Sequence, residues 1–226
     1  MCGRFTISIS TDELKEYLKE SYEIEESKTD FDLPRYNVAP GQPIISIIND
    51  GKKNRVGHFK WGLVPPFAKD EKMGNNLINA KSETLLDKPS FKPSLENKRC
   101  IIIANGFYEW KREEKQKQPM YIKMVDSSIF PIAGLWSTYT RTDGSKLHTA
   151  TIITTSANTL VSSIHDRMPV ILTEESKKIW LNPQIKDLSV LLKLLMPFDS
   201  NQMQTYPVSS LVNSATNDTP ECMIQV

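Results

Sequence analysis

The spacing of apolar side chains near the start of the chain predicts a short amphipathic helix. Ser10 and Glu13 form the S-x-x-E pattern of a capping box, which satisfies backbone N–H groups at a helix start. Leu14, Tyr17 and Leu18 follow at a spacing that places them on one helical face. We therefore expect a helix over about residues 11–20.

Most other apolar segments have the length and β-branched composition of strands. Residues 44–48 and 56–61 flank the turn pair Asp50-Gly51, which predicts a β-hairpin. Residues 99–104 form a nearly continuous apolar strand that runs into Asn105-Gly106. Further strands are expected at residues 120–124, 129–135, 149–155 and 170–172.

Three segments show no regular pattern. Residues 34–43 are expected to be irregular, and residues 62–98 form a long polar excursion of the kind that is usually functional or disordered. The charged residues 111–118 are predicted to form a hairpin tip.

The second half of the chain also contains helix signals. Residues 158–164 are predicted as a short helix, Thr173 followed by two glutamates starts another, and Asp187 opens a third through residues 188–195. Strands and helices come in mixed order without βαβ alternation. This order predicts one α+β domain over residues 1–226, with a mixed, mostly antiparallel β core and flanking short helices.

Composition and charge restrict the class of protein further. Hydrophobic residues make up 39% and charged residues 24%, which is typical of a globular protein. The net charge of +1 excludes a grossly basic protein, but residues 12–32 carry −6, so the rest carries +7 and allows a local positive groove. An acidic solvated helix on an ordinary surface explains the same charges.

The number and spacing of the cysteines, together with the pattern of the first residues, favour a reducing compartment. No apolar run approaches the roughly 18 residues of a membrane span, and the first residues lack a secretory leader pattern. Cys2, Cys100 and Cys222 are odd in number and far apart, which argues against a disulfide framework or a zinc ribbon. We expect a cytoplasmic protein, nucleoid-associated if bacterial, with no metal and no cofactor.

Cys2 is the first candidate for chemistry. Removal of Met1, which a small second residue permits, would leave a terminal cysteine with an amine and a thiol on one skeleton. Their reference pKa values of about 8 and 8.5 leave both partly nucleophilic near neutral pH. The thiolate could attack an acyl carbon, or the amine could condense with an aldehyde before the thiol closes a thiazolidine ring. Alternatively, Cys2 is simply a small residue in an N-terminal strand.

Three other polar residues have suitable surroundings for a site. Glu109 lies between Tyr108 and Trp110, and aromatic flanks favour a raised pKa and acid–base work. His165 lies where a helix-like stretch meets a strand, and histidine suits proton transfer near pH 7. Asn79 ends the irregular excursion. A solvent-facing Glu109 and a hydrogen-bonded core histidine are the ordinary alternatives.

Seven segments, in order along nearly the whole chain, resemble one family. They are Met1-Cys-Gly-Arg-Phe5, Arg35-Tyr-Asn-Val-Ala-Pro-Gly41, Trp61-Gly-Leu-Val-Pro65, Ile78-Asn-Ala-Lys-Ser-Glu-Thr84, Gly106-Phe-Tyr-Glu-Trp110, Ile164-His-Asp-Arg-Met-Pro169 and Tyr206-Pro-Val-Ser209. Each segment is weak alone, but together they resemble the SOS-response-associated peptidases, the abasic-site processing proteins.

The resemblance implies a fold of that type and a specific reaction. Family members recognise abasic sites in single-stranded DNA and at junctions, and form a thiazolidine cross-link between the N-terminal cysteine and the sugar aldehyde. It implies that Cys2 is the nucleophile and that Glu109 assists ring opening and proton transfer. His165 would handle protons in Schiff-base formation and reversal, and Asn79 would position the sugar or its 3′ phosphate. Lyase side activity and self-catalysed Met1 removal are also implied.

The DNA contacts expected from the same resemblance lie beside these residues. Arg4, Lys81 and Arg167 would contact phosphates, although the family usually has arginine where Lys81 stands. Trp61 and Phe67 could stack on bases or wedge a duplex end, with core packing as the alternative. Asn37 completes the expected DNA-binding set. The expected partner is abasic single-stranded DNA, without a membrane, and the protein is expected to be a monomer.

Three rival functions fit parts of the sequence. An N-terminal-nucleophile amidohydrolase also begins Met-Cys-Gly, and Asn105-Gly106 could mimic its oxyanion hole. A non-catalytic single-stranded DNA binder would use the +7 remainder and lose affinity steeply with salt. A general peptidase would use Cys2 and His165 as a dyad.

Overall fold

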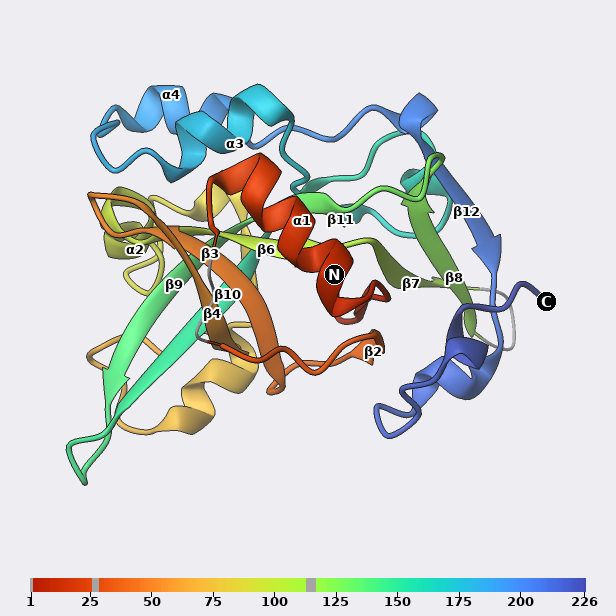
Figure 1. Cartoon of the computed structure of the whole chain (residues 1–226), viewed down its shortest axis with the longest axis horizontal. Coiled ribbons are helices and arrows are strands. Elements are labelled where there is room, and N and C mark those ends of the chain that lie inside the picture. Colours follow the sequence, from red (N-terminus) through yellow and green to blue (C-terminus); the bar gives the residue numbers. More distant parts are fainter. Residues whose placement is uncertain (1, 26–28, 113–116) are drawn as a thin grey trace.

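The computed structural model describes residues 2–25, 29–112 and 117–226, which form two β-sheets with helices packed around them (Figure 1). One sheet has five strands in the order β12 (Met203–Pro207), β8 (Lys117–Met124), β7 (Gly106–Arg112), β1 (Phe5–Ile7) and β2 (Arg35–Val38). All its pairings are antiparallel. In Figure 1, β7, β8 and β12 lie on the side of the C-terminus.

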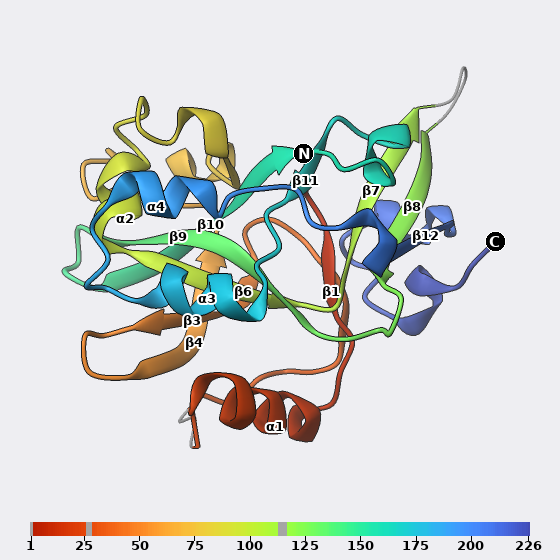
Figure 2. The ribbon, with the colours of Figure 1, turned by 90° about the horizontal axis from the view of Figure 1, so that it is seen from above.

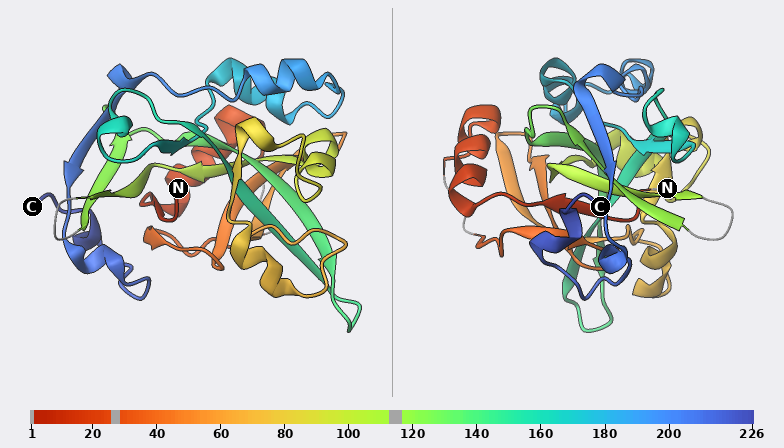
Figure 3. Two further views of the ribbon diagram at one scale, coloured as in Figure 1. Left: turned by 180° about the vertical axis from the view of Figure 1, so that it is seen from behind. Right: turned by 90° about the vertical axis from the view of Figure 1, so that its right-hand side faces the viewer.

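The second sheet has seven strands. They are β11 (Arg167–Pro169), β10 (Lys146–Ser156), β4 (Asn54–Trp61), β3 (Pro43–Asn49), β6 (Arg99–Ala104), β9 (Phe130–Thr140) and β5 (Asn79–Lys81). β10 pairs in parallel with β4 and β5, and antiparallel with β9 and β11. The β9–β10 hairpin projects from the body of the molecule (Figure 3). Together the two sheets confirm an α+β fold that is mostly antiparallel.

Four α-helices of the described residues pack outside the sheets. They are α1 (Thr11–Tyr22), α2 (Lys92–Asn97), α3 (Glu174–Leu181) and α4 (Leu188–Lys193). The predicted capping box starts α1, because Ser10 accepts from the Glu13 amide while the Glu13 carboxylate accepts from the Ser10 amide. Thr173 and Asp187 cap α3 and α4 as expected. Local capping chemistry therefore predicted three of the helix starts.

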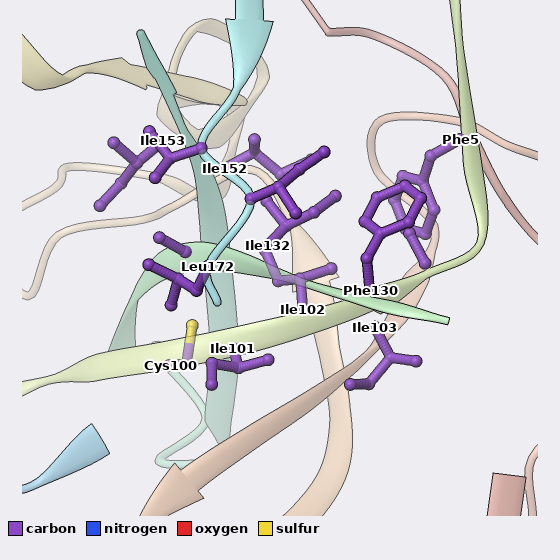
Figure 4. Close-up of a cluster of buried hydrophobic side chains, with 14 of the residues drawn as sticks. Phe5, Cys100, Ile101, Ile102, Ile103, Phe130, Ile132, Ile152, Ile153 and Leu172 are labelled. Atoms are coloured by element: carbon purple, nitrogen blue, oxygen red, sulfur yellow. The ribbon is translucent and has the colours of Figure 1, made fainter. Parts of the chain in front are cut away.

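The core is built on β6, all six of whose residues are buried. Figure 4 shows Ile102 on the face of this strand that meets Ile132, with Ile101 and Ile103 on the opposite face. A strand buried on both faces needs a continuous apolar run, which explains why residues 99–104 do not alternate. Phe5 of β1 packs against Trp61 of β4 with the rings tilted by 54° and their centroids 5.1 Å apart, which joins the two sheets.

Several predicted segments differ in the structure. Residues 34–43 are not wholly irregular, because they contain β2 and the start of β3. The strand expected at residues 170–172 lies instead at Arg167–Pro169, after which the chain crosses from β10 to β9 and Ile171 forms an isolated bridge with Ile132. Residues 158–164 contain one 3-10 turn, Val161–Ser163.

The excursion over residues 62–98 carries more structure than expected, since it contains β5, α2 and the 3-10 helices Glu71–Asn76 and Ser82–Thr84. Strands β7 and β8 extend to Arg112 and from Lys117, and residues 113–116 of the predicted hairpin tip lie outside the described residues. No helix among the described residues is both long and apolar enough to cross a membrane.

Candidate functional site

Strand pairing brings the N-terminal cysteine to Glu109. β1 pairs antiparallel with β7, with Phe5 opposite Phe107, and the Tyr108 amide donates to the Arg4 carbonyl at 3.0 Å (Figure 2). Cys2, just before β1, and Glu109, on β7, therefore lie in one region of the five-stranded sheet. The charge of Glu109 contributes to a raised pKa of the Cys2 thiol, which agrees with this proximity.

The glycine at position 106 leaves room for the side chain of Tyr121 on β8. A Cβ built at Gly106 would lie 2.1 Å from the hydroxyl oxygen of Tyr121 on β8. That hydroxyl lies 2.9 Å from the hydroxyl of Thr6 on β1. Gly106 thus admits the Tyr121 ring beside the strand that carries Glu109.

The seven-stranded sheet supplies Asn79, and His165 lies two residues before its strand β11. β5 pairs with β10, which places Asn79 opposite Ile152, and β10 pairs with β11, which places Arg167 opposite Ser156. Asn79 Nδ2 donates to the Cys2 carbonyl at 2.8 Å. This hydrogen bond joins the two sheets at the site.

Burial determines the acid–base properties of the site. Glu109 is 2% exposed, and burial raises the pKa of its carboxyl to about 7. Cys2 is fully buried, and burial raises the pKa of its thiol far above its ordinary value, with the charge of Glu109 adding to the effect. Burial lowers the pKa of His165. At neutral pH the thiol is therefore protonated, and Glu109 can both hold and release a proton.

His165 follows the 3-10 turn Val161–Ser163, and its own amide donates to the Val161 carbonyl at 2.9 Å. The backbone N–H of Arg167 donates to Nδ1 of His165 at 3.0 Å, and Oδ1 of Asp166 lies 2.8 Å from the same nitrogen. Asp166 was not singled out from the sequence. Its position directly after a candidate histidine was the available signal.

The expected phosphate-binding cations differ in how they are engaged. Lys81 is exposed. Arg167 forms a two-point ion pair with Glu83 at 2.7 and 2.9 Å and donates to the Thr154 carbonyl. Arg4 donates to Asn37 Oδ1 at 2.8 Å and to the carbonyls of residues 212 and 213. A phosphate on either arginine would compete with these bonds, whereas Lys81 presents its ammonium to solvent.

The structure places two of the expected DNA contacts inside the protein. Asn37 is fully buried, and its Nδ2 donates to the carbonyls of residues 212, 214 and 217, so it anchors the C-terminal segment. Trp61 is 1% exposed, and its Nε1 donates to the Ile78 carbonyl. Neither side chain is placed to contact DNA, and core packing is the role of Trp61. Phe67 is 60% exposed.

The oxyanion-hole interpretation of Asn105 does not fit the structure. Asn105 Oδ1 accepts from the Thr6 hydroxyl and the Ser8 amide, and its Nδ2 donates to the Ser8 hydroxyl. This side chain therefore fixes the segment after β1. All three cysteines are free thiols, and within the described part of the chain no group of three His, Cys, Asp or Glu side chains could hold a metal.

Comparison with known proteins finds relatives that match along nearly the whole chain. The chain is 51% identical over 222 residues to "Abasic site processing protein YoqW" of Bacillus subtilis, covering 98% of each chain. It is 34% identical to "Abasic site processing protein HMCES" of Gallus gallus, covering 85% of this chain and 66% of the relative. A crystal structure of a protein from Bacteroides thetaiotaomicron has a TM-score of 0.86 at 29% identity and full coverage of both chains.

A model of one family, described as "SOS response associated peptidase (SRAP)", matches residues 1–215 of the chain. That span contains Cys2, Asn79, Glu109 and His165 together with every strand of both sheets. The chain therefore belongs to the SRAP family.

Proposed function

We propose that this protein processes abasic sites in single-stranded DNA by forming a covalent thiazolidine cross-link through Cys2. The observation that carries the proposal is the contact of Asn79 with the backbone of Cys2, in a region where burial gives Glu109 a pKa of about 7. A terminal cysteine, a carboxyl that shares its proton at neutral pH and an amide donor are the groups that this reaction requires. The curated relatives named for abasic-site processing support the substrate class.

The raised thiol pKa supports an order of steps in which the amine reacts first. Removal of Met1 creates an amine on Cys2, whose nitrogen adds to the open-chain sugar aldehyde and forms an imine with loss of water. The thiol sulfur then bonds to the imine carbon, and the thiol proton passes through Glu109 to the nitrogen. Glu109 can donate a proton to the departing oxygen and accept the thiol proton, because its pKa lies near 7.

The proposal is tested by mixing the processed protein with matched abasic and intact single strands and resolving the products on a denaturing gel. We expect an adduct with the abasic strand alone. Cys2→Ala, and a version in which a residue before Cys2 cannot be removed, should both give none. An equal yield from the blocked protein would refute the aminothiol mechanism.

Cys2→Ser separates the two covalent steps. Serine keeps the terminal amine, so we expect an imine that borohydride traps, but little adduct without the reductant. Cleavage of the strand by β-elimination should increase, because no ring protects the imine. A stable adduct from Cys2→Ser without reductant would show that sulfur is not required.

A further inference from the structure

Nδ1 of His165 has two neighbours that require opposite protonation states. The Arg167 backbone N–H donates to it at 3.0 Å, which needs a lone pair on Nδ1. Oδ1 of Asp166 lies 2.8 Å from the same nitrogen, and a hydrogen bond there needs a proton on Nδ1. One ring nitrogen cannot satisfy both neighbours at the same time.

The two contacts therefore correspond to two states of the ring. When Nδ1 accepts from the Arg167 amide, a neutral imidazole carries its proton on Nε2, and Nε2 is a donor. When Nδ1 donates to Asp166, Nε2 of the neutral ring has a lone pair and can accept a proton, which gives the imidazolium. The partner chosen by Nδ1 thus sets the direction in which Nε2 can move a proton.

We propose that Asp166 is a positioning residue whose carboxylate competes with the Arg167 amide for Nδ1 of His165, and so sets whether Nε2 donates or accepts a proton. Its catalytic meaning rests on the proposed function, whereas the position of the proton does not. Both competing groups belong to the next two residues of the chain. The choice between them therefore needs only local motion of the Asp166 side chain, which is 85% exposed.

The charges around His165 give the proposal a definite sign. Among side chains of the described residues, Asp166 raises the pKa of His165, while Arg112 on β7 and Arg167 on β11 lower it, in addition to the larger effect of burial. Asp166 also raises the pKa of Glu109. Removing the Asp166 charge should therefore move the titrations of His165 and Glu109 in the same direction, to lower pH.

The test is an NMR titration of the imidazole nitrogens in the full-length protein and in Asp166→Asn. The chain has three histidines, so His58 and His148 serve as internal controls. We expect Asp166→Asn to increase the share of the neutral ring that carries its proton on Nε2, because the carboxylate that favours a proton on Nδ1 is gone. We expect the His165 midpoint to fall by about half a pH unit or more in Asp166→Asn, a size typical of one exposed carboxylate neighbour. Arg112→Gln should shift the same midpoint upward.

A matched control removes an exposed acid elsewhere. Asp12→Asn on α1 should leave the His165 midpoint unchanged, and Asp166→Glu should restore it in part. In a cross-linking assay, Asp166→Asn should move both limbs of the pH–rate profile to lower pH, whereas a merely structural role would lower the rate equally at every pH.

An unchanged midpoint in Asp166→Asn, or an unchanged share of the neutral ring with its proton on Nε2, would overturn the proposal. These readouts need no DNA. Absence of any adduct would therefore refute the proposed function while leaving the assignment of Asp166 to be decided by the titration.

Discussion

Glu109 lies where an ionised carboxylate is costly. It is 2% exposed on β7, and burial raises the pKa of its carboxyl to about 7, whereas its ordinary value is 4.5. The fold therefore holds a proton near Cys2 at a pH where an exposed glutamate would have lost it. A group kept for chemistry in this way should reduce stability when it ionises.

The pH dependence of stability should expose this cost. Between pH 4.5 and 7 the unfolded chain has lost the Glu109 proton and the folded chain still holds it, so the contribution of this group to stability falls as the pH rises. We expect Glu109→Gln to remove that fall and to be more stable than wild type at pH 8 by on the order of 2 kcal/mol. Urea denaturation of both proteins at pH 5 and pH 8 measures it. A difference that does not grow with pH would contradict the assignment.

Asn79 acts on Cys2 through one hydrogen bond, from its Nδ2 to the Cys2 carbonyl. We expect Asn79→Ala to slow adduct formation about five- to tenfold, because a lost hydrogen bond of about 1 kcal/mol leaves the N-terminal segment less well positioned. Asn97→Ala, at an exposed position of α2, is the matched control. Rates come from quenched time courses on denaturing gels, and equal rates for the two variants would argue against a positioning role for Asn79.

At the scale of elements, the sequence predicted what is encoded locally. The capping box of α1, the hairpin around Asp50-Gly51 and the buried run of β6 each follow from neighbouring residues. Strands β2 and β12 were not predicted, because they are short and depend on distant partners. β2, for example, is held by Asp218, which accepts from the amides of Tyr36 and Asn37.

For the candidate site too, the sequence predicted the identity of the residues but not their arrangement in space. Cys2, Glu109 and His165 were chosen for their chemistry and for a family resemblance, both of which are properties of single residues and short motifs. That Cys2 lies close to Glu109 and Asn79 depends on the pairing of β1 with β7 and of β10 with β5, and no local pattern encodes these pairings. The inward positions of Asn37 and Trp61 likewise depend on tertiary packing.

The buried ring of Tyr121 occupies the space where a side chain at position 106 would lie. We expect Gly106→Ala to destabilise the protein by about 2 kcal/mol or more, because the added methyl group would lie 2.1 Å from the Tyr121 hydroxyl oxygen in a closed core. Gly57→Ala on β4 is the control, since its Cβ would meet nothing within 4 Å. Thermal or urea unfolding measures both variants. Similar free energies of unfolding for the two variants would show that the Tyr121 side chain can move aside at little cost.

At the scale of the whole molecule, the chain ends are fastened to the sheet that carries the site. Asn37 on β2 donates to three carbonyls of the C-terminal segment, and its Oδ1 accepts from Arg4, two residues after Cys2. Residues from the start, the first quarter and the end of the chain thus form one buried network. Lys81, in contrast, presents an exposed charge two residues after Asn79. Replacing Lys81 should therefore change the affinity for DNA, whereas replacing Asn37 should change the stability of the fold.

We expect Lys81→Ala to weaken binding of intact single-stranded DNA and to reduce the slope of log affinity against log salt by about 0.7, the value for one lost phosphate contact. The free energy of unfolding should change little, as for any exposed lysine.

Asn37→Ala should instead cost about 2–4 kcal/mol of stability, because it leaves buried carbonyls without a donor. The slope of log affinity against log salt, measured on the folded protein, should stay the same. Lys52→Ala, at the tip of the β3–β4 hairpin, controls for loss of a surface charge. Fluorescence anisotropy at several salt concentrations and urea unfolding separate the two outcomes. A reduced slope in Asn37→Ala with unchanged stability would return Asn37 to the DNA interface, and a slope in Lys81→Ala equal to that in Lys52→Ala would remove Lys81 from it.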